Sequence, residues 1–374
     1  MAKKAYIGVN GVARKIKKGY VGVDGVARKI KKAYIGIGGV ARPCWSGGEL
    51  TYYGTITTLS KARTRLAATT VGSYALFGGG CTKEHSSSSS EQCDTVDTYN
   101  ASLTRGTASV LSVARHSLAA TTVGNYALFG GGNRNYYVAT VDTYNASLTK
   151  GTASDLTVGR GYLAATTVGN YALFGGGTGS TYAVVNAYDN SLSQSAPASL
   201  NAQQTNLAAA TVGDYALFSG GSLSDGNYTT SVTAYNSSLT RSKPTALGES
   251  RYNHAGATVG NYAIFAGGSV GITLRSTVYA YNKSLTMSKL ANKQLGWGTR
   301  GTSIEGFAVF AGGQTANASY GGASIAYDES LTQIVTDTIT SRSFLASTTI
   351  GNYALFCGGY NGSARNYAEA FTVV

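Results

Sequence analysis

Short apolar runs recur along the chain at a nearly constant spacing, and most of them belong to one repeated phrase. In the second copy an apolar run at 118–123 is followed by the turn Gly124-Asn125, a second apolar run at 126–129 and a glycine pair. The copies align on the aromatic residue that opens the second run: Tyr74, Tyr126, Tyr171, Tyr215, Tyr262, Phe307 and Tyr353. Their spacings of 44 to 52 residues indicate a repeat architecture.

Each copy contains two further runs of the same kind. A linker of variable length leads to a third run at 141–144, and a fourth run extends from about 151 to 156. Short β-branched and aromatic runs bounded by Gly, Asn and Ser are typical of strands. Four short strands in one period of this length predict a propeller blade and not a βαβ unit. We therefore predict an all-β fold in which residues 46–374 form a seven-bladed β-propeller.

The two ends of this region predict how the ring closes. The seventh copy ends in its third strand, at 368–374, and has no fourth strand. Residues 52–60, just before the first copy, align with the missing strand. An N-terminal strand in the last blade would close the ring and leave no open sheet edge between the first and last copies.

Three recurring features of the copies resemble the kelch repeat: a glycine pair after the second strand, a tyrosine in the third, and an arginine before the first. The arginines are Arg63, Arg115, Arg160, Arg251 and Arg342, and the tyrosines are Tyr99, Tyr144, Tyr188, Tyr235, Tyr281 and Tyr327. The resemblance implies a kelch-like propeller over almost nine-tenths of the chain. The sequence departs from the kelch pattern where leucine replaces tryptophan after the third strand, and where Gln204 and Gly296 replace arginine. We expect the arginines to bond strand-end carbonyls, although they could instead ring the axis and grip an anion.

Residues 1–45 contain a second repeat of three 14-residue units. Each centres on a hairpin turn signal, Asn10-Gly11, Asp24-Gly25 or Gly38-Gly39. With Val9 opposite Val12, we expect one aliphatic face and one cationic face. The aliphatic face would comprise Ala5, Ile7, Val9, Val12 and Ile16, and the cationic face Lys4, Tyr6, Lys15 and Lys17. Isolated hairpins are marginal in water, so the segment is predicted to be an anchor or oligomerisation region. Its predicted anchor residues are Lys4, Tyr6, Ile7, Val9, Val12, Ile16, Tyr20 and Tyr34.

The basic charge of the protein belongs mainly to this segment. Residues 1–45 hold eleven Lys or Arg and one acid, whereas the rest of the chain holds nineteen bases and sixteen acids. Short basic hairpins ahead of a propeller resemble the attachment regions of bacteriophage tail or fibre proteins. The resemblance implies virion structural proteins as partners and a homo-oligomer, of which a trimer is one form. The alternatives are a solvated basic tail and phosphate binding to nucleic acid, which one tyrosine per unit disfavours.

The connections between the second and third strands vary most among the blades and are rich in Tyr, Ser, Gly and Asn. This is the composition of binding loops on a rigid scaffold. The predicted ligand-binding residues are Arg134, Asn135, Tyr136, Tyr137, Tyr182, Tyr228, Arg275, Tyr320, Tyr360 and Tyr367. Aromatic rings that stack on sugars favour a host glycan, and a protein surface is the other option. Polar, variable hairpin loops without a ligand remain the third reading.

The sequence offers no catalytic constellation. The chain has three histidines, His85, His116 and His254, and no nucleophile elbow, phosphate loop or metalloprotease motif. We therefore predict no enzyme activity, no cofactor and no metal. Cys81 and Cys93 flank a loop and form either a disulfide or two thiols; a metal site with His85 is a weaker alternative. Cys357 is expected to be a small buried hydrophobe.

These patterns leave three functional hypotheses. The first is a non-enzymatic virion protein that is anchored by residues 1–45 and binds a host-surface glycan through the propeller loops. The second is an intracellular kelch-type interaction module, and the third is a carbohydrate-active propeller enzyme. No membrane span or secretory signal is expected. The predicted location is the virion, after synthesis in the bacterial cytoplasm, with the cytoplasm as the alternative.

Overall fold

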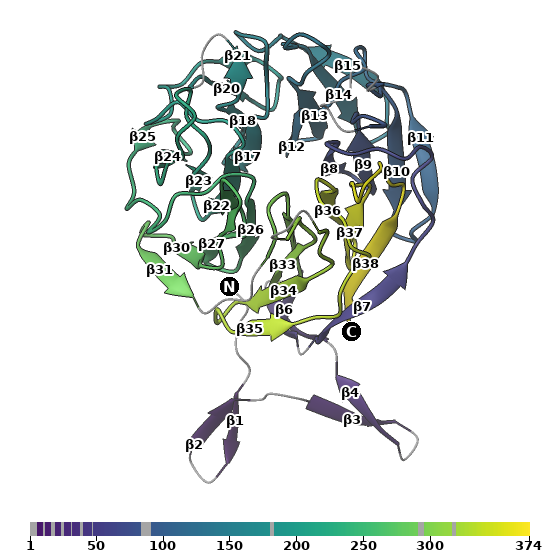
Figure 1. The fold of residues 1–374 in the computed structure, drawn as a ribbon. Helices are drawn as coiled ribbons and strands as arrows, with labels where there is room; N and C mark the ends of the chain where they lie inside the picture. Colours follow the sequence, from purple (N-terminus) through teal and green to yellow (C-terminus); the bar gives the residue numbers. More distant parts are fainter. Residues whose placement is uncertain are drawn as a thin grey trace.

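The computed structural model describes residues 6–9, 12–15, 19–23, 26–30, 32–37, 40–46, 48–83, 91–179, 183–290, 295–315 and 319–374. Its elements are strands throughout, and seven four-stranded sheets are arranged around a common axis as the blades of a propeller (Figure 1). The described part of the chain therefore contains no helix long and apolar enough to cross a membrane. The all-β, seven-bladed fold predicted from the repeat is confirmed.

In blades 1 to 6 the strands follow one another in sequence from the axis outward, and in blade 7 the outermost strand comes from the N-terminal end of the propeller. Blades 1 to 3 consist of β8 (Ala67–Val71), β9 (Tyr74–Gly78), β10 (Val96–Asn100) and β11 (Arg105–Ala108); β12 (Ala119–Val123), β13 (Tyr126–Gly130), β14 (Val141–Asn145) and β15 (Lys150–Ala153); and β17 (Ala164–Val168), β18 (Tyr171–Gly175), β20 (Val185–Tyr188) and β21 (Gln194–Ser195).

Blades 4 to 7 repeat this arrangement. They consist of β22 (Ala208–Val212), β23 (Tyr215–Ser219), β24 (Val232–Asn236) and β25 (Arg241–Ser242); β26 (Ala255–Val259), β27 (Tyr262–Ala266), β30 (Val278–Asn282) and β31 (Met287–Leu290); β32 (Arg300–Ile304), β33 (Phe307–Ala311), β34 (Ser324–Asp328) and β35 (Gln333–Val335); and β36 (Ala346–Ile350), β37 (Tyr353–Cys357), β38 (Ala368–Val373) and β7 (Leu50–Thr55). Within the described part of the propeller region, two short two-stranded pairs lie outside the blades: β16 (Arg160–Gly161) with β19 (Thr178–Gly179), and β28 (Ser269–Val270) with β29 (Thr273–Leu274).

The last blade is built from both ends of the propeller region. Strand β7 pairs antiparallel with β38, from Leu50 opposite Val373 to Thr55 opposite Glu369. This confirms closure by an N-terminal strand, although pairing begins at Leu50 and ends at Thr55 instead of covering 52–60. Closure removes the sheet edge that an incomplete seventh blade would expose.

The core lies between neighbouring blades. The phenylalanine of each second strand is fully buried; in blade 2 Phe129 belongs to one cluster with Leu76 and Val96 of blade 1. Phe129 also packs edge-on against Tyr144 of its own blade at 5.8 Å, the arrangement that aromatic rings prefer. The Tyr144 hydroxyl donates to the carbonyl of Ser109 at 2.7 Å. The third-strand tyrosine is thus a structural residue.

The N-terminal segment contains three hairpins: β1 (Tyr6–Val9) with β2 (Val12–Lys15), β3 (Gly19–Val23) with β4 (Val26–Ile30), and β5 (Lys32–Ile37) with β6 (Val40–Ser46). The predicted pairing of Val9 with Val12 is confirmed. The predicted faces need a correction, because the same register sets Arg14 directly opposite Ile7, and opposed positions share a face of the hairpin. The face expected to be aliphatic therefore includes a basic position. The predicted residues Lys4, Ala5, Ile16 and Lys17 lie outside the described part of the chain.

Candidate binding site at the mouth of the central channel

The first strand of every blade lines a central channel. At one end of this channel lies a cavity of about 220 Å³, to which all seven blades contribute lining residues. The connections between second and third strands lie at the same end, because bridges such as Thr205–Ser222 and Trp297–Gln314 join them to the residues just before the first strands. We call this end the mouth.

A closed ring of backbone hydrogen bonds surrounds the mouth. In each blade the residue nine positions before the repeat aromatic donates its N–H to the carbonyl of the equivalent residue in the preceding blade, at 2.8 to 3.0 Å. The seven residues of this mouth ring are Arg65, Ser117, Tyr162, Asn206, Asn253, Gly298 and Phe344. Arg65 accepts from Ser117 and donates to Phe344, so the ring has no open end.

Every member of the mouth ring has a left-handed backbone conformation. The six non-glycine members have φ between 51° and 57°, and Gly298 has φ 73°. Such angles are unusual for bulky residues such as Tyr162 and Phe344, and strained positions of this kind cluster at functional sites. The left-handed turn brings six ring members into the cavity wall, all but Gly298. The backbone is therefore uniform while the side chains differ from blade to blade.

A series of aromatic rings lies beside the cavity and crosses from blade 4 to blade 7. Tyr228 stacks on Tyr252 with centroids 4.9 Å apart, and Tyr252 lies 6.1 Å from Trp297. Trp297 contacts Phe344 edge-on at 4.9 Å. The guanidinium of Arg65 then lies over the Phe344 ring at 4.3 Å. We call Tyr228, Tyr252, Trp297 and Phe344 the aromatic arc.

The structure distributes the predicted loop residues over the mouth without gathering them into one site. Tyr228 belongs to the aromatic arc, whereas Arg134, Asn135, Tyr136 and Tyr137 are exposed. The other described members make local contacts: Arg275 donates to the Ser250 carbonyl, Tyr320 packs on Tyr360 at 5.7 Å, and Arg365 lies over Tyr367 at 5.7 Å. Tyr182 lies outside the described residues.

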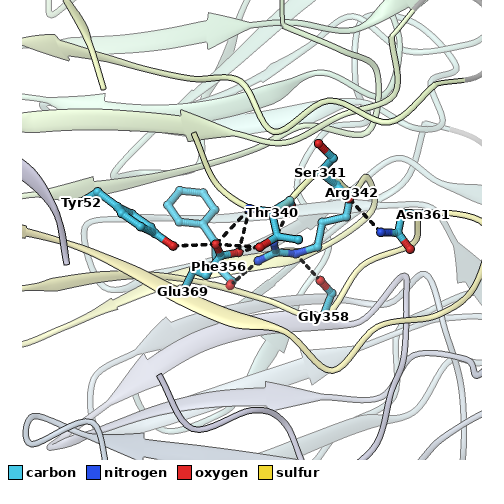
Figure 2. Close-up of polar contacts among 8 residues, drawn as sticks. All are labelled: Tyr52, Thr340, Ser341, Arg342, Phe356, Gly358, Asn361 and Glu369. Carbon is cyan, nitrogen blue, oxygen red and sulfur yellow. Dashed lines mark hydrogen bonds and ion pairs between the residues drawn. The ribbon is translucent and has the colours of Figure 1, made fainter. Parts of the chain in front are cut away.

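The blade arginines have the structural role expected of them. All five are fully buried, and Arg342 donates from Nη2 to the Phe356 carbonyl at 2.9 Å and pairs with Glu369, as Figure 2 shows. Arg63 and Arg115 bond the carbonyls of Phe77 and Phe129 in the same way. They hold strand ends within a blade and do not line the mouth cavity.

The two departures from the arginine pattern are matched by a change on the third strand. Where blade 2 pairs Arg115 with Asp142 at 2.9 Å, both side chains are fully buried. The position of Asp142 is occupied by Thr233 in blade 4, where Gln204 replaces the arginine, and by the fully buried Ile325 in blade 6. An acid is not required for the arginine, because blade 3 keeps Arg160, which donates to Asn186 Oδ1 at 2.9 Å and to the Phe174 carbonyl at 3.1 Å.

The histidines and cysteines within the described residues occupy packed positions. His254 is buried, its Nε2 lies 3.0 Å from the Ser219 hydroxyl, and burial followed by the nearby Arg251 charge lowers its pKa well below 6.5. His116 Nδ1 lies 2.9 Å from the Ser117 hydroxyl. His85 is outside the described part of the chain. Within that part, no three His, Cys, Asp or Glu side chains gather as a metal site.

Cys81 and Cys93 lie buried at the base of the blade 1 loop. The structure holds Cys93 as a thiol and not in a disulfide. Burial raises the pKa of this thiol. Cys357 is fully buried, and burial raises the pKa of its thiol. It occupies the place of a small apolar residue, as expected.

Sequence reasoning missed most of the mouth because it placed the ligand-binding residues only in the connections between the second and third strands. The signal was present at two positions in the phrase. The ring position varies in every blade except for two asparagines, and seven residues before the repeat aromatic stands alanine in six blades but Arg300 in blade 6. Both positions line the cavity. Variation inside the phrase marks the site more closely than loop composition does.

Comparison with known proteins identifies the fold alone. No protein-family profile matches the chain, and no curated protein sequence matches it. A solved structure described as "Structure of YjhT" is similar over 85% of this chain and 96% of its own, with a TM-score of 0.53 and 10% identity. The likeness supports the propeller architecture derived from the strand order.

Proposed function

We propose that the protein is a non-enzymatic saccharide-binding propeller of a bacteriophage virion, attached through residues 1–45 and directed at a glycan of the host surface. The main support for saccharide binding is the aromatic arc beside the mouth cavity. Tyr228, Tyr252 and Trp297 of the arc are partly exposed, and partly exposed rings can stack on the apolar face of a pyranose. Amides and hydroxyls of the cavity wall, such as those of Asn206, Asn253 and Ser117, can bond its hydroxyl groups.

A binding role without catalysis is supported by the chemistry of the cavity wall. Among the described residues that line the cavity there is no carboxylate, and the histidine among them, His254, is held in its neutral form by burial. General acid–base catalysis of glycoside cleavage ordinarily uses a pair of carboxyl groups. Turnover of any bound sugar by the purified protein would instead favour the carbohydrate-active enzyme.

Saccharide binding can be tested on a glycan array with the full chain and two variants, Trp297→Ala and Tyr252→Ala. We expect the wild type to bind a defined group of glycans and each variant to lose at least about ten-fold in affinity, since truncation of a stacked aromatic removes a large contact area. The control is Tyr53→Ala, because Tyr53 is 52% exposed on the outer strand β7. Binding unchanged in the two arc variants would contradict the proposal.

Anchoring through residues 1–45 is supported by the positive charge of this segment and by three hairpins that pair alike beside the turn: Val9 with Val12, Val23 with Val26, and Ile37 with Val40. Removal of residues 1–45 leaves the closure strand β7 intact, since its pairing begins at Leu50. We expect the full chain to form a homo-oligomer in solution and the truncated chain to be monomeric by light scattering. Equal masses per assembly for both chains would contradict an anchoring or oligomerisation role.

An intracellular kelch-type module that binds proteins is the second candidate. It is favoured by exposed apolar side chains on the mouth loops: Ile272 is 93% exposed and Tyr136 60%. Absence of binding to every saccharide on the array, with retention of a protein partner by the wild type but not by an Ile272→Ser variant, would favour this function over the first.

A further inference from the structure

Two arginines line the mouth cavity without an acidic partner. Arg65 belongs to the mouth ring, and Arg300 begins the first strand of blade 6. Among the described residues, the ion pairs of the protein involve other side chains, and no Asp or Glu lines the cavity. Two like charges in a confined space are unfavourable unless an anion lies between them or nearby.

Aromatic rings hold the Arg65 guanidinium in place. Its central carbon lies 4.3 Å from the centroid of Phe344 and 5.8 Å from that of Tyr162. Stacking of this kind engages the face of the guanidinium and leaves the N–H groups at its edge available. No hydrogen bond from the Arg65 side chain to a described residue is present, so its donors point to no partner in that part of the protein.

Arg300 stands at a position of the cavity wall that is alanine in every other blade. The equivalent position is alanine in the six other blades: Ala67, Ala119, Ala164, Ala208, Ala255 and Ala346. One guanidinium nitrogen of Arg300 donates to the adjacent Thr299 carbonyl at 2.9 Å, which leaves most of its donors unused. Burial, and then the charge of Arg65, lowers the pKa of Arg300 to about 10. Both cations line the same cavity of about 220 Å³.

Neutral polar groups complete the cavity wall. The amides of Asn206 and Asn253 and the hydroxyl of Tyr162 line it without a side-chain hydrogen bond to any described residue. At about 220 Å³ the cavity is smaller than the ~300 Å³ at which sites for drug-sized ligands begin, and a single sugar ring suits that scale. A carboxylate can accept paired hydrogen bonds from a guanidinium, and ring hydroxyls can bond the amides.

We propose that the mouth cavity binds the carboxylate of an acidic sugar residue, with Arg65 and Arg300 as its anion-binding pair. This inference rests on the proposed saccharide binding and narrows its ligand to acidic glycans. The aromatic arc would contact the neighbouring sugars of the chain, because it extends outward from Phe344 at the cavity wall.

The test compares two ligands that differ in one group: methyl glucuronide and methyl glucoside. Titration calorimetry with the full chain should show the glucuronide binding at least about ten-fold more tightly, and Arg65→Gln and Arg300→Gln should each remove that preference. Arg241→Gln serves as the matched control, because Arg241 is an exposed arginine on the outer strand β25. Thermal melts of all three variants establish that they fold.

Three outcomes would overturn the inference. Equal affinity for the two glycosides would refute the anion site and leave the proposed function standing. Inorganic phosphate binding as tightly as the glucuronide would show a site for free oxyanions instead of acidic sugars. Failure of both glycosides to bind while neutral glycans bind on the array would also refute it. If no saccharide of any kind binds, the proposed function itself fails.

Discussion

The hydroxyl of Tyr52 donates a 2.7 Å hydrogen bond to Oε1 of Glu369, which joins the strand that closes the ring to the last strand of the chain. Glu369 also pairs with the buried Arg342 and accepts from the Thr340 N–H at 2.9 Å, as Figure 2 shows. The Arg342 charge and these hydrogen bonds hold the pKa of Glu369 below 4.5 against the opposing effect of burial. The closure of the propeller thus includes a buried ionic centre.

Substitutions at this centre should affect stability unequally. Tyr52→Phe removes one neutral donor and should lower the free energy of unfolding by about 1 kcal/mol. Glu369→Gln leaves the Arg342 charge buried without its counter-ion and should cost about 3–5 kcal/mol. Urea denaturation measures both, and Tyr53→Phe, on the same strand and 52% exposed, is the control. A loss for Glu369→Gln no larger than that for Tyr52→Phe would contradict the ionic role.

Gly298 is the position of the mouth ring where an added methyl group should destabilise the protein. Gly298 has φ 73°, and a Cβ there would lie 3.1 Å from ring carbons of Phe344. We expect Gly298→Ala to destabilise the protein by more than the ~1 kcal/mol that a left-handed alanine costs alone. The control is Gly226→Ala, where φ is 83° and nothing lies within 4 Å of the added carbon. Equal losses for the two variants in thermal unfolding would show that contact with Phe344 contributes nothing.

The repeat determined how much of this molecule could be predicted. Seven copies of one phrase define seven blades, and the truncated last copy predicts the closure strand, because the physical need to pair every sheet edge leaves few alternatives. The structural role of Arg115 also followed from its recurrence in five of the seven copies. The mouth ring did not, because the left-handed conformation of Arg65 or Phe344 depends on hydrogen bonds between residues about 45 positions apart or more. No local sequence signal encodes such a bond, although the substitution of Arg300 for alanine was visible in the alignment of the copies.

Two buried titratable groups predict that the stability of the protein falls with decreasing pH in two separate pH ranges. The first range belongs to Asp142. Asp142 accepts hydrogen bonds from Ser112 and pairs with Arg115, which together hold its pKa below 3.8 although burial acts to raise it. A carboxyl group with a lowered folded-state pKa contributes stability above its unfolded pKa and loses that contribution as the pH falls through the folded value. Asp142→Asn should therefore flatten the decline in stability below about pH 4 that wild type shows. Thermal melts across pH 2 to 5 measure this, and an unchanged acid profile in the variant would contradict it.

The second range belongs to His254. Its folded-state pKa lies well below 6.5, so the folded protein binds fewer protons than the unfolded chain once the pH drops under that value. Stability is complete above the unfolded pKa and falls as the pH decreases toward the folded pKa, by about 1.4 kcal/mol between pH 8 and pH 5.5 for one such group. His254→Gln keeps a polar side chain near Ser219 and cannot take up the proton. The pH dependence of its unfolding free energy should be shallower than that of wild type by this amount. A variant whose stability falls between pH 8 and pH 5.5 as steeply as wild type would show that His254 is protonated in the folded protein without cost.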